Sequence, residues 1–300
     1  MKTSIIKTLS IFTVLLIAFA INPISLKGQE KATEKKATEK KADKPVRNPW
    51  EAGMLIETQT DLVWAPKTLE FVIQHRFGEL NSGTFDLAGL YAPSNIRIAL
   101  NYGLFKNAQI GMGTTKDNKL QDLNWKYKIL TQTKSGSMPI AVTYYGNVEY
   151  DARDKENFGA EAEYKGSFRM SYFNQLIISR KFSKKVTAQI TGSYAHYNLV
   201  DSVFTPDLKH DNFAIGVAGR VKISRQTSII IEYDVPLTTP DYIKPNYSIG
   251  VEMATSSHAF HIFITTYDGI SPQRNLTYNT NDFFKGDILI GFNITRNWNF

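Results

Sequence analysis

The features that most resemble sites of chemistry are a glycine-rich stretch at residues 111–116 and a set of five histidines. The stretch reads Gly-Met-Gly-Thr-Thr-Lys, which lacks the Gly-x4-Gly-Lys-Ser/Thr spacing of a phosphate loop. It also continues into a strand pattern, and not into a helix whose N-terminus would hold phosphate. Of the histidines, His258 and His261 are the close pair, but on a strand they point to opposite faces. We therefore expect neither a nucleotide site nor a shared metal.

Enzymatic catalysis is also not expected. Hydrolases at a lipid-facing surface use serine and histidine together, and His75 could serve as such a base on an outward strand face. The outward positions of the next predicted strand, from Ile96 to Tyr102, supply no serine beside it. The absence of cysteine excludes a disulfide framework, a thiolate zinc site and a cysteine nucleophile. The sequence thus predicts no catalytic, cofactor-binding or metal-binding residue, and His75 is interpreted as an interfacial residue.

A third group of residues is charged and falls on the polar face of predicted strands. Opposite charges are nearly balanced there, and two interpretations remain open. The charges could pair across a barrel interior and close it, or they could line a narrow hydrated pore that orients a small polar solute. The candidate lumen-facing residues are Arg76, Arg97, Lys126, Lys128, Glu149, Arg169, Arg220, Glu232, Asp234 and Glu252.

The elements that must position these charges are strands. From residue 69 onward, apolar and polar residues alternate in about twelve segments, which is the period of a strand with two different faces. Short turns and longer loops alternate between the segments, and no helical segments are present to cover a soluble sheet. This predicts an all-β fold: a transmembrane antiparallel up-and-down β-barrel over 69–300 with both termini periplasmic. A soluble β-sandwich is the alternative, but it leaves rows of outward tyrosines and tryptophans unexplained.

The last segment carries the clearest signal of membrane insertion. An outward apolar row runs to the terminal residue, and an aromatic C-terminus of this kind is typical of barrels read by outer-membrane assembly machinery. We therefore expect contacts with outer-membrane lipid and with the barrel-assembly machinery. The residues assigned to this assembly signal are Phe292, Ile294, Trp298 and Phe300.

The N-terminal part is organised differently from the rest. Residues 1–28 have the basic start and the 13-residue apolar run of a cleavable signal peptide, with cleavage near Gly28 or, as the alternative, after Ala20. Residues 29–47 form a Lys/Glu-rich repeat expected to be a disordered periplasmic tether. Residues 48–68 are an apolar lead-in that we interpret as a plug, an extra strand or part of a partner-docking site. The first fifty residues hold ten basic and four acidic residues, so most of the net positive charge lies in this segment. The rest of the chain is nearly neutral, and we do not expect it to bind nucleic acid.

Several stretches together resemble a known family, the membrane-bound β-barrel domain-of-unknown-function family of outer-membrane proteins from Bacteroidota-like bacteria. The similarity extends over roughly 55–300, and it implies a barrel in the outer membrane without implying a reaction or a ligand. The stretches that carry it are Gln74-His75-Arg76-Phe77-Gly78, Ser94-Asn95-Ile96-Arg97, Asn101-Tyr102-Gly103, Gly111-Met112-Gly113-Thr114-Thr115-Lys116, Lys126-Tyr127 and the ending Ile290-Gly-Phe-Asn-Ile-Thr-Arg-Asn-Trp-Asn-Phe300.

Two functions follow as hypotheses from these patterns. The first is a narrow channel or transport barrel for a small polar solute, with selectivity set by the inward charges. The second is a non-conducting barrel that docks a surface partner or a periplasmic partner, the latter through residues 29–66. No cofactor and no nucleic-acid partner is expected for either function.

Overall fold

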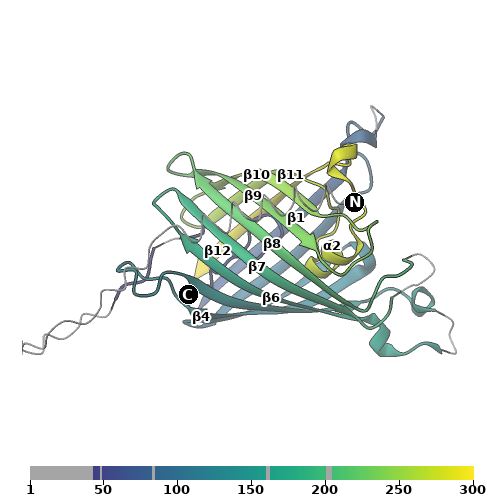
Figure 1. Ribbon diagram of the computed structural model, residues 1–300, viewed down its shortest axis with the longest axis horizontal. Coiled ribbons are helices and arrows are strands. Elements are labelled where there is room, and N and C mark those ends of the chain that lie inside the picture. Colours follow the sequence, from purple (N-terminus) through teal and green to yellow (C-terminus); the bar gives the residue numbers. More distant parts are fainter. Residues whose placement is uncertain (1–42, 48, 83–84, 160–162, 201–204) are drawn as a thin grey trace, which may run out of the picture. The chain divides into compact units, whose positions relative to one another are not determined.

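The computed structural model describes residues 43–47, 49–82, 85–159, 163–200 and 205–300. Within them, twelve antiparallel strands pair in sequence order and close into a barrel, with β1 hydrogen-bonded to β12 (Figure 1). The predicted signal peptide at 1–28 and residues 29–42 of the predicted tether lie outside the described residues. The predicted all-β up-and-down barrel and its number of strands are confirmed.

The strands are eight to twelve residues long, which suits tilted strands that cross a hydrocarbon layer. Their bounds are β1 Thr68–Glu79, β2 Asn95–Phe105, β3 Ala108–Thr115, β4 Leu120–Leu130, β5 Ala141–Asp151, β6 Met170–Lys181, β7 Val186–Tyr197, β8 Asp211–Lys222, β9 Thr227–Pro236, β10 Asn246–Ala254, β11 His258–Thr265 and β12 Leu289–Asn299.

The two ends of the barrel differ in their connections. One end, called here the short-turn end, carries the turns that follow β2, β4, β6, β8 and β10, and also the C-terminus. The opposite end, the loop end, carries the longer connections at 80–94, 152–169, 198–210, 237–245 and 266–288. The predicted alternation has one exception, because the β3–β4 connection at 116–119 is shorter than the β4–β5 connection at 131–140.

Burial alternates along the strands as the sequence pattern predicted. In β1, Glu70 and Gln74 are buried inward, whereas Phe71 and Ile73 face outward. In β11, His258 and His261 do point to opposite faces. Many outward apolar side chains are exposed in the isolated chain, which is the arrangement a membrane covers with lipid.

Strand β6 departs from the expected polar interior. Phe173 and Ile177 point inward and are fully buried, together with Tyr145, Ala195 and Ala214 of neighbouring strands. The sequence pattern assigned only the polar residues of this strand to the inside. The apolar patch exists because a segment from the β11–β12 connection packs against it, as described below.

The helical elements are short. The α-helix α2 spans Pro272–Tyr278, and single 3-10 turns occur in several connections. No helix in the described ranges is both long enough and apolar enough to cross a membrane.

The two faces of β12 make a direct test of membrane insertion possible. Phe292 faces outward and stacks on His75 with ring centroids 5.0 Å apart, while Asn293 is fully buried inside. We expect Phe292→Arg to impair assembly, because a cation at mid-depth on a lipid-facing surface costs about 2–4 kcal/mol. Asn293→Ser should assemble normally. The measurement is the heat-modifiable band of membrane fractions on a gel, and loss of that band for Asn293→Ser alone would mean that the faces are reversed.

Candidate functional site: the filled interior of the barrel

Residues 50–66, called here the plug segment, lie inside the barrel. They fold back on themselves as a hairpin, with a bridge between Met54 and Gln59 and a hydrogen bond from the Leu55 amide to the Thr58 carbonyl. The segment enters and leaves at the short-turn end, where it joins β1. No strand of the wall pairs with it along a ladder, so the barrel closes without it.

Residues 43–46, which precede the plug segment, are bound to the β4–β5 turn at the short-turn end. Pro45 bridges Thr133 in the β4–β5 turn, and the Val46 amide donates to the Gln132 carbonyl. The Asp43 carboxylate accepts hydrogen bonds from the hydroxyls of Ser135 and Ser137 in the same turn. These bonds, chiefly the one from Ser135, lower the pKa of Asp43 to about 2, so the carboxylate stays ionised at any pH above that.

The tip of the plug segment is held by a carboxylate of the wall. Glu232 of β9 accepts hydrogen bonds from three consecutive amides, those of Ile56, Glu57 and Thr58, at 2.6, 3.1 and 3.2 Å. From β12, the Asn293 side-chain amide donates to the Ile56 carbonyl at 2.7 Å. The wall thereby satisfies backbone groups of a tight turn that water does not reach.

The stem of the hairpin is held by a lysine of β4. The ammonium group of Lys126 donates to the carbonyl oxygens of Gly53, Thr60 and Leu62. Gly103 of β2 allows the chain to leave the interior, because a Cβ there would lie 2.0 Å from the Ala65 carbonyl oxygen.

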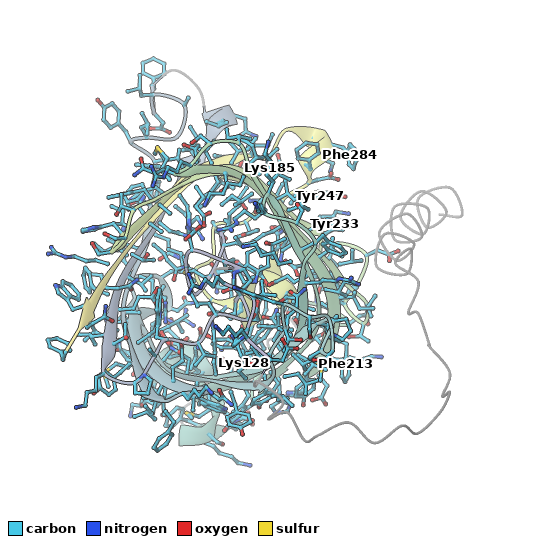
Figure 2. All side chains as sticks on the ribbon, turned by 90° about the vertical axis from the view of Figure 1, so that its left-hand side faces the viewer. Lys128, Lys185, Phe213, Tyr233, Tyr247 and Phe284 are labelled. Carbon is cyan, nitrogen blue, oxygen red and sulfur yellow. The ribbon has the colours of Figure 1, made fainter. Side chains whose placement is uncertain are left out.

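The acidic residues of the plug segment pair with cations of the wall. Asp61 lies 3.3 Å from the Lys128 ammonium, and Glu51 lies 3.0 Å from Lys222 and 3.3 Å from Arg220. These contacts come from β4 and β8, on different sides of the barrel. In Figure 2, which looks in from the short-turn end, Lys128 lies inside the ring of strands.

At mid-depth, Glu57 makes the same kind of contact with β1. Its carboxylate lies 3.1 Å from the Arg76 guanidinium, which also donates to the Ile56 carbonyl. Arg76 is completely buried and lies over the ring of Phe263, 4.6 Å from its centroid. A buried guanidinium needs such partners, since an unpaired buried charge is strongly unfavourable.

Apolar contacts add to the polar ones. Trp50, Leu55 and Ile56 are buried in one cluster with Phe263 and Tyr267. Complete burial of an aliphatic side chain contributes roughly 1.5–3 kcal/mol relative to exposure. A buried ion pair contributes little net free energy, because its attraction is offset by the loss of hydration. The apolar cluster and the hydrogen bonds to backbone amides therefore contribute most to holding the plug segment inside the barrel.

The loop-end half of the interior is filled by the β11–β12 connection. Ser271 caps α2 and donates to the Glu149 carboxylate at 2.8 Å, and Gln273 donates to Asn147 at 3.0 Å. Leu276 packs on the apolar patch around Phe173. The β11–β12 connection at 266–288 therefore turns inward in part.

Most of the predicted lumen-facing charges do lie inside. Arg97 pairs with Asp122 at 2.7 Å, and Gly113 makes room for the pair, because a Cβ there would lie 2.6 Å from the guanidinium. Arg169 is placed elsewhere. It ends a 3-10 turn before β6, with its guanidinium against the rings of loop residues such as Phe158. The predicted residues inside are Arg76, Arg97, Lys126, Lys128, Glu149, Arg220, Glu232, Asp234 and Glu252.

Sequence reasoning did not assign a role to the three acids of the plug segment. Glu51, Glu57 and Asp61 lie in a segment without a basic residue, and the interpretation of that segment as a plug, an extra strand or part of a docking site rested on its apolar residues. That absence of cations was a usable signal, because acids in such a segment need partners from elsewhere in the chain once they are buried. Within the described residues, no group of three histidines, cysteines or acids is arranged to hold a metal ion.

With the plug segment inside, the polar side chains of the inner wall are shielded from water. Arg76, Lys126, Gln74 and Glu70 of the wall are at most 1% exposed, whereas an open aqueous lumen would hydrate them. Between the plug tip and α2 lies a cavity of about 30 Å³, room for about one water molecule. A larger cavity of about 430 Å³ lies at the short-turn end. The structure is that of a closed barrel.

An apolar outside, a polar inside and a closed ladder of strands define a membrane-bound β-barrel protein. A family described as membrane bound beta barrel domain (DUF5777) matches residues 50–298, and the chain belongs to this family. The match includes the plug segment as well as the twelve strands.

Several solved barrels are similar in outline. The NanC porin is 10% identical, with 76% of this chain and 97% of that chain covered and a TM-score of 0.48. The KdgM porin in complex with disordered oligogalacturonate is 5% identical, with 78% and 99% covered and a TM-score of 0.43. Outer membrane phospholipase A from Escherichia coli, an active site mutant, is 11% identical, with 81% and 95% covered and a TM-score of 0.42. No curated protein matches the chain.

Proposed function

We propose that this protein is a gated channel for small polar solutes and that the structure is its closed state. The observation that carries the proposal is the separation of wall and plug segment. The twelve-stranded wall is complete without residues 50–66, yet its inner face is polar and charged. A barrel that serves only as a scaffold would gain more stability from an apolar filling than from buried ions.

The polar contacts of the plug segment are of a kind that water can replace. Most of its contacts with the wall are hydrogen bonds and ion pairs, and water would replace both in an open lumen. Each exchanged hydrogen bond has a net value of only about 0.5–1.5 kcal/mol. The inserted and withdrawn states therefore differ by a small balance of large opposing terms, which is the condition for gating.

We further propose that the barrel resides in the outer membrane and is exported by a signal peptide at residues 1–28. In this arrangement the short-turn end and both termini are periplasmic. The support is the alternation of short turns and longer loops, with basic residues such as Lys106, Lys184 and Arg225 in the turns. The plug segment then enters from the periplasmic side.

A reversible cross-link tests the gate. The chain has no cysteine, so Asp61→Cys with Ser179→Cys introduces a single pair at a site where the native side chains lie 2.5 Å apart. In planar bilayers, we expect the oxidised variant to stay closed, because the plug segment is then bound covalently to β6. Reduction should restore openings, and each single-cysteine variant should be insensitive to oxidant.

A folded barrel that stays silent when reduced, at every voltage that the bilayer tolerates, is not a channel of this kind. Such a result favours the docking barrel, in which the plug segment is a permanent part of the core. Oxidised and reduced proteins with equal openings would show that residues 50–66 do not gate the path.

A further inference from the structure

The short-turn mouth of the barrel is a cavity of about 430 Å³ with charged walls. Arg47 and Lys128 contribute cations to its lining, and Glu51 and Asp61 of the plug segment contribute carboxylates. Two further cations, Arg220 and Lys222, do not line the cavity but contact Glu51 at 3.3 and 3.0 Å. The cations belong mainly to the wall, whereas the acids that balance them belong to the movable segment.

The carboxylates of the wall do not replace those of the plug segment. Glu252 is engaged with Arg220 at 3.3 Å and with His261 at 3.4 Å, and Glu70 accepts a hydrogen bond from Asn101 at 2.8 Å. Neither lies in an ion pair with Lys128 or Lys222 in the described part of the chain. Withdrawal of Glu51 and Asp61 would leave these two lysines without a carboxylate partner.

We infer that this mouth is a binding site for a multivalent anion and that the plug carboxylates occupy it in the closed state. The inference rests on the proposed channel and names the class of solute that the channel takes. Two separated carboxylates, Glu51 and Asp61, already contact cations on β8 and β4. A solute with two or more anionic groups would satisfy the same cations and compete with the plug segment.

Charge and size restrict the class of ligand. A monovalent anion meets one lysine and cannot replace both contacts, whereas a multivalent anion can bridge the mouth. The cavity has room for a molecule of several non-hydrogen atoms beside Trp50 and Trp64. Carboxylates and phosphates share this chemistry, so citrate and pyrophosphate serve as separate probes.

The test is equilibrium binding to the full-length barrel in detergent, by calorimetry at constant ionic strength. Glu51→Gln with Asp61→Asn removes the competing charges and should tighten citrate or pyrophosphate binding by about tenfold or more, because two like charges no longer oppose the anion. The matched control is Asp154→Asn with Glu156→Gln in an exposed loop-end turn, which changes the net charge equally. Adding Lys128→Gln and Lys222→Gln to the first variant should abolish the gain.

A second readout uses the wild-type chain, in case the neutralised plug segment prevents folding. The Trp50 indole donates to Asp61 at 2.5 Å, so an anion that displaces Asp61 from Lys128 changes the surroundings of Trp50. We expect citrate to shift its fluorescence, and Trp50→Phe to lose that shift. Which probe binds distinguishes a carboxylate from a phosphate solute.

Equal affinity in the neutralised variant and its loop control would overturn the inference, as would binding that survives the lysine substitutions. Binding is measured without any current, so this failure is separable from failure of the channel. An anion that binds to a silent barrel contradicts the channel alone, and a conducting barrel that binds no anion contradicts the site alone.

Discussion

Deleting residues 43–66 and replacing 270–279 by a glycine-serine linker is expected to convert the closed barrel into a continuously open pore. The two segments occlude the interior in series, from the short-turn end and from the loop end. Each segment blocks the path while it is inserted, and each can leave it only briefly, so both must be removed for a steady current. We expect a time-averaged conductance at least tenfold above that of the wild type in planar bilayers.

The single changes serve as controls for this prediction. Deletion of 43–66 alone, or replacement of 270–279 alone, should give brief openings and no steady current, because one barrier remains. Heat modifiability on a gel shows whether each variant has folded. A folded double variant without current would contradict the channel and would make the filled interior a structural core.

The second large effect is expected from Glu232→Ala. This carboxylate accepts hydrogen bonds from three consecutive amides at the plug tip, and its loss leaves buried donors without an acceptor. A buried donor left without an acceptor costs about 1–3 kcal/mol, and 1.4 kcal/mol is a factor of ten in an equilibrium. We expect the plug segment to be withdrawn about 10- to 100-fold more often, with a smaller effect for Glu232→Gln.

Limited proteolysis measures this withdrawal independently of current. Trp50 and Leu55 of the plug segment are chymotrypsin sites that are buried in the inserted state, so cleavage after them should accelerate with the withdrawn population. Glu149→Ala is the matched control, because Glu149 is a buried wall carboxylate that contacts Ser271 of the loop-end segment instead. Equal acceleration in both variants would mean that general loosening, and not the tip contact, controls the plug segment.

The barrel itself was predictable from the sequence because the signal is local. Each strand lies between lipid and a polar interior, so its faces alternate every second residue, as in β1 and β12. The turn residues and the aromatic ending are likewise readable along the chain. The inward positions of Arg97, Lys126 and Glu232 followed directly from this period. The same period predicted an inward position for Arg169, but β6 begins only at Met170, so Arg169 lies outside the strand.

The contents of the barrel were decided by the tertiary structure. Glu57 meets Arg76, Asp61 meets Lys128, and Glu232 meets amides about 175 residues earlier in the chain. The sequence contains no periodic pattern that identifies such pairs, because any inward cation can pair with any acidic residue that the fold brings near. The sequence alone determined a membrane barrel with a charged interior. Only the closed three-dimensional arrangement determined that the chain's own N-terminal hairpin and loop helix fill it, since burial of those charges is favourable only when every partner is in place.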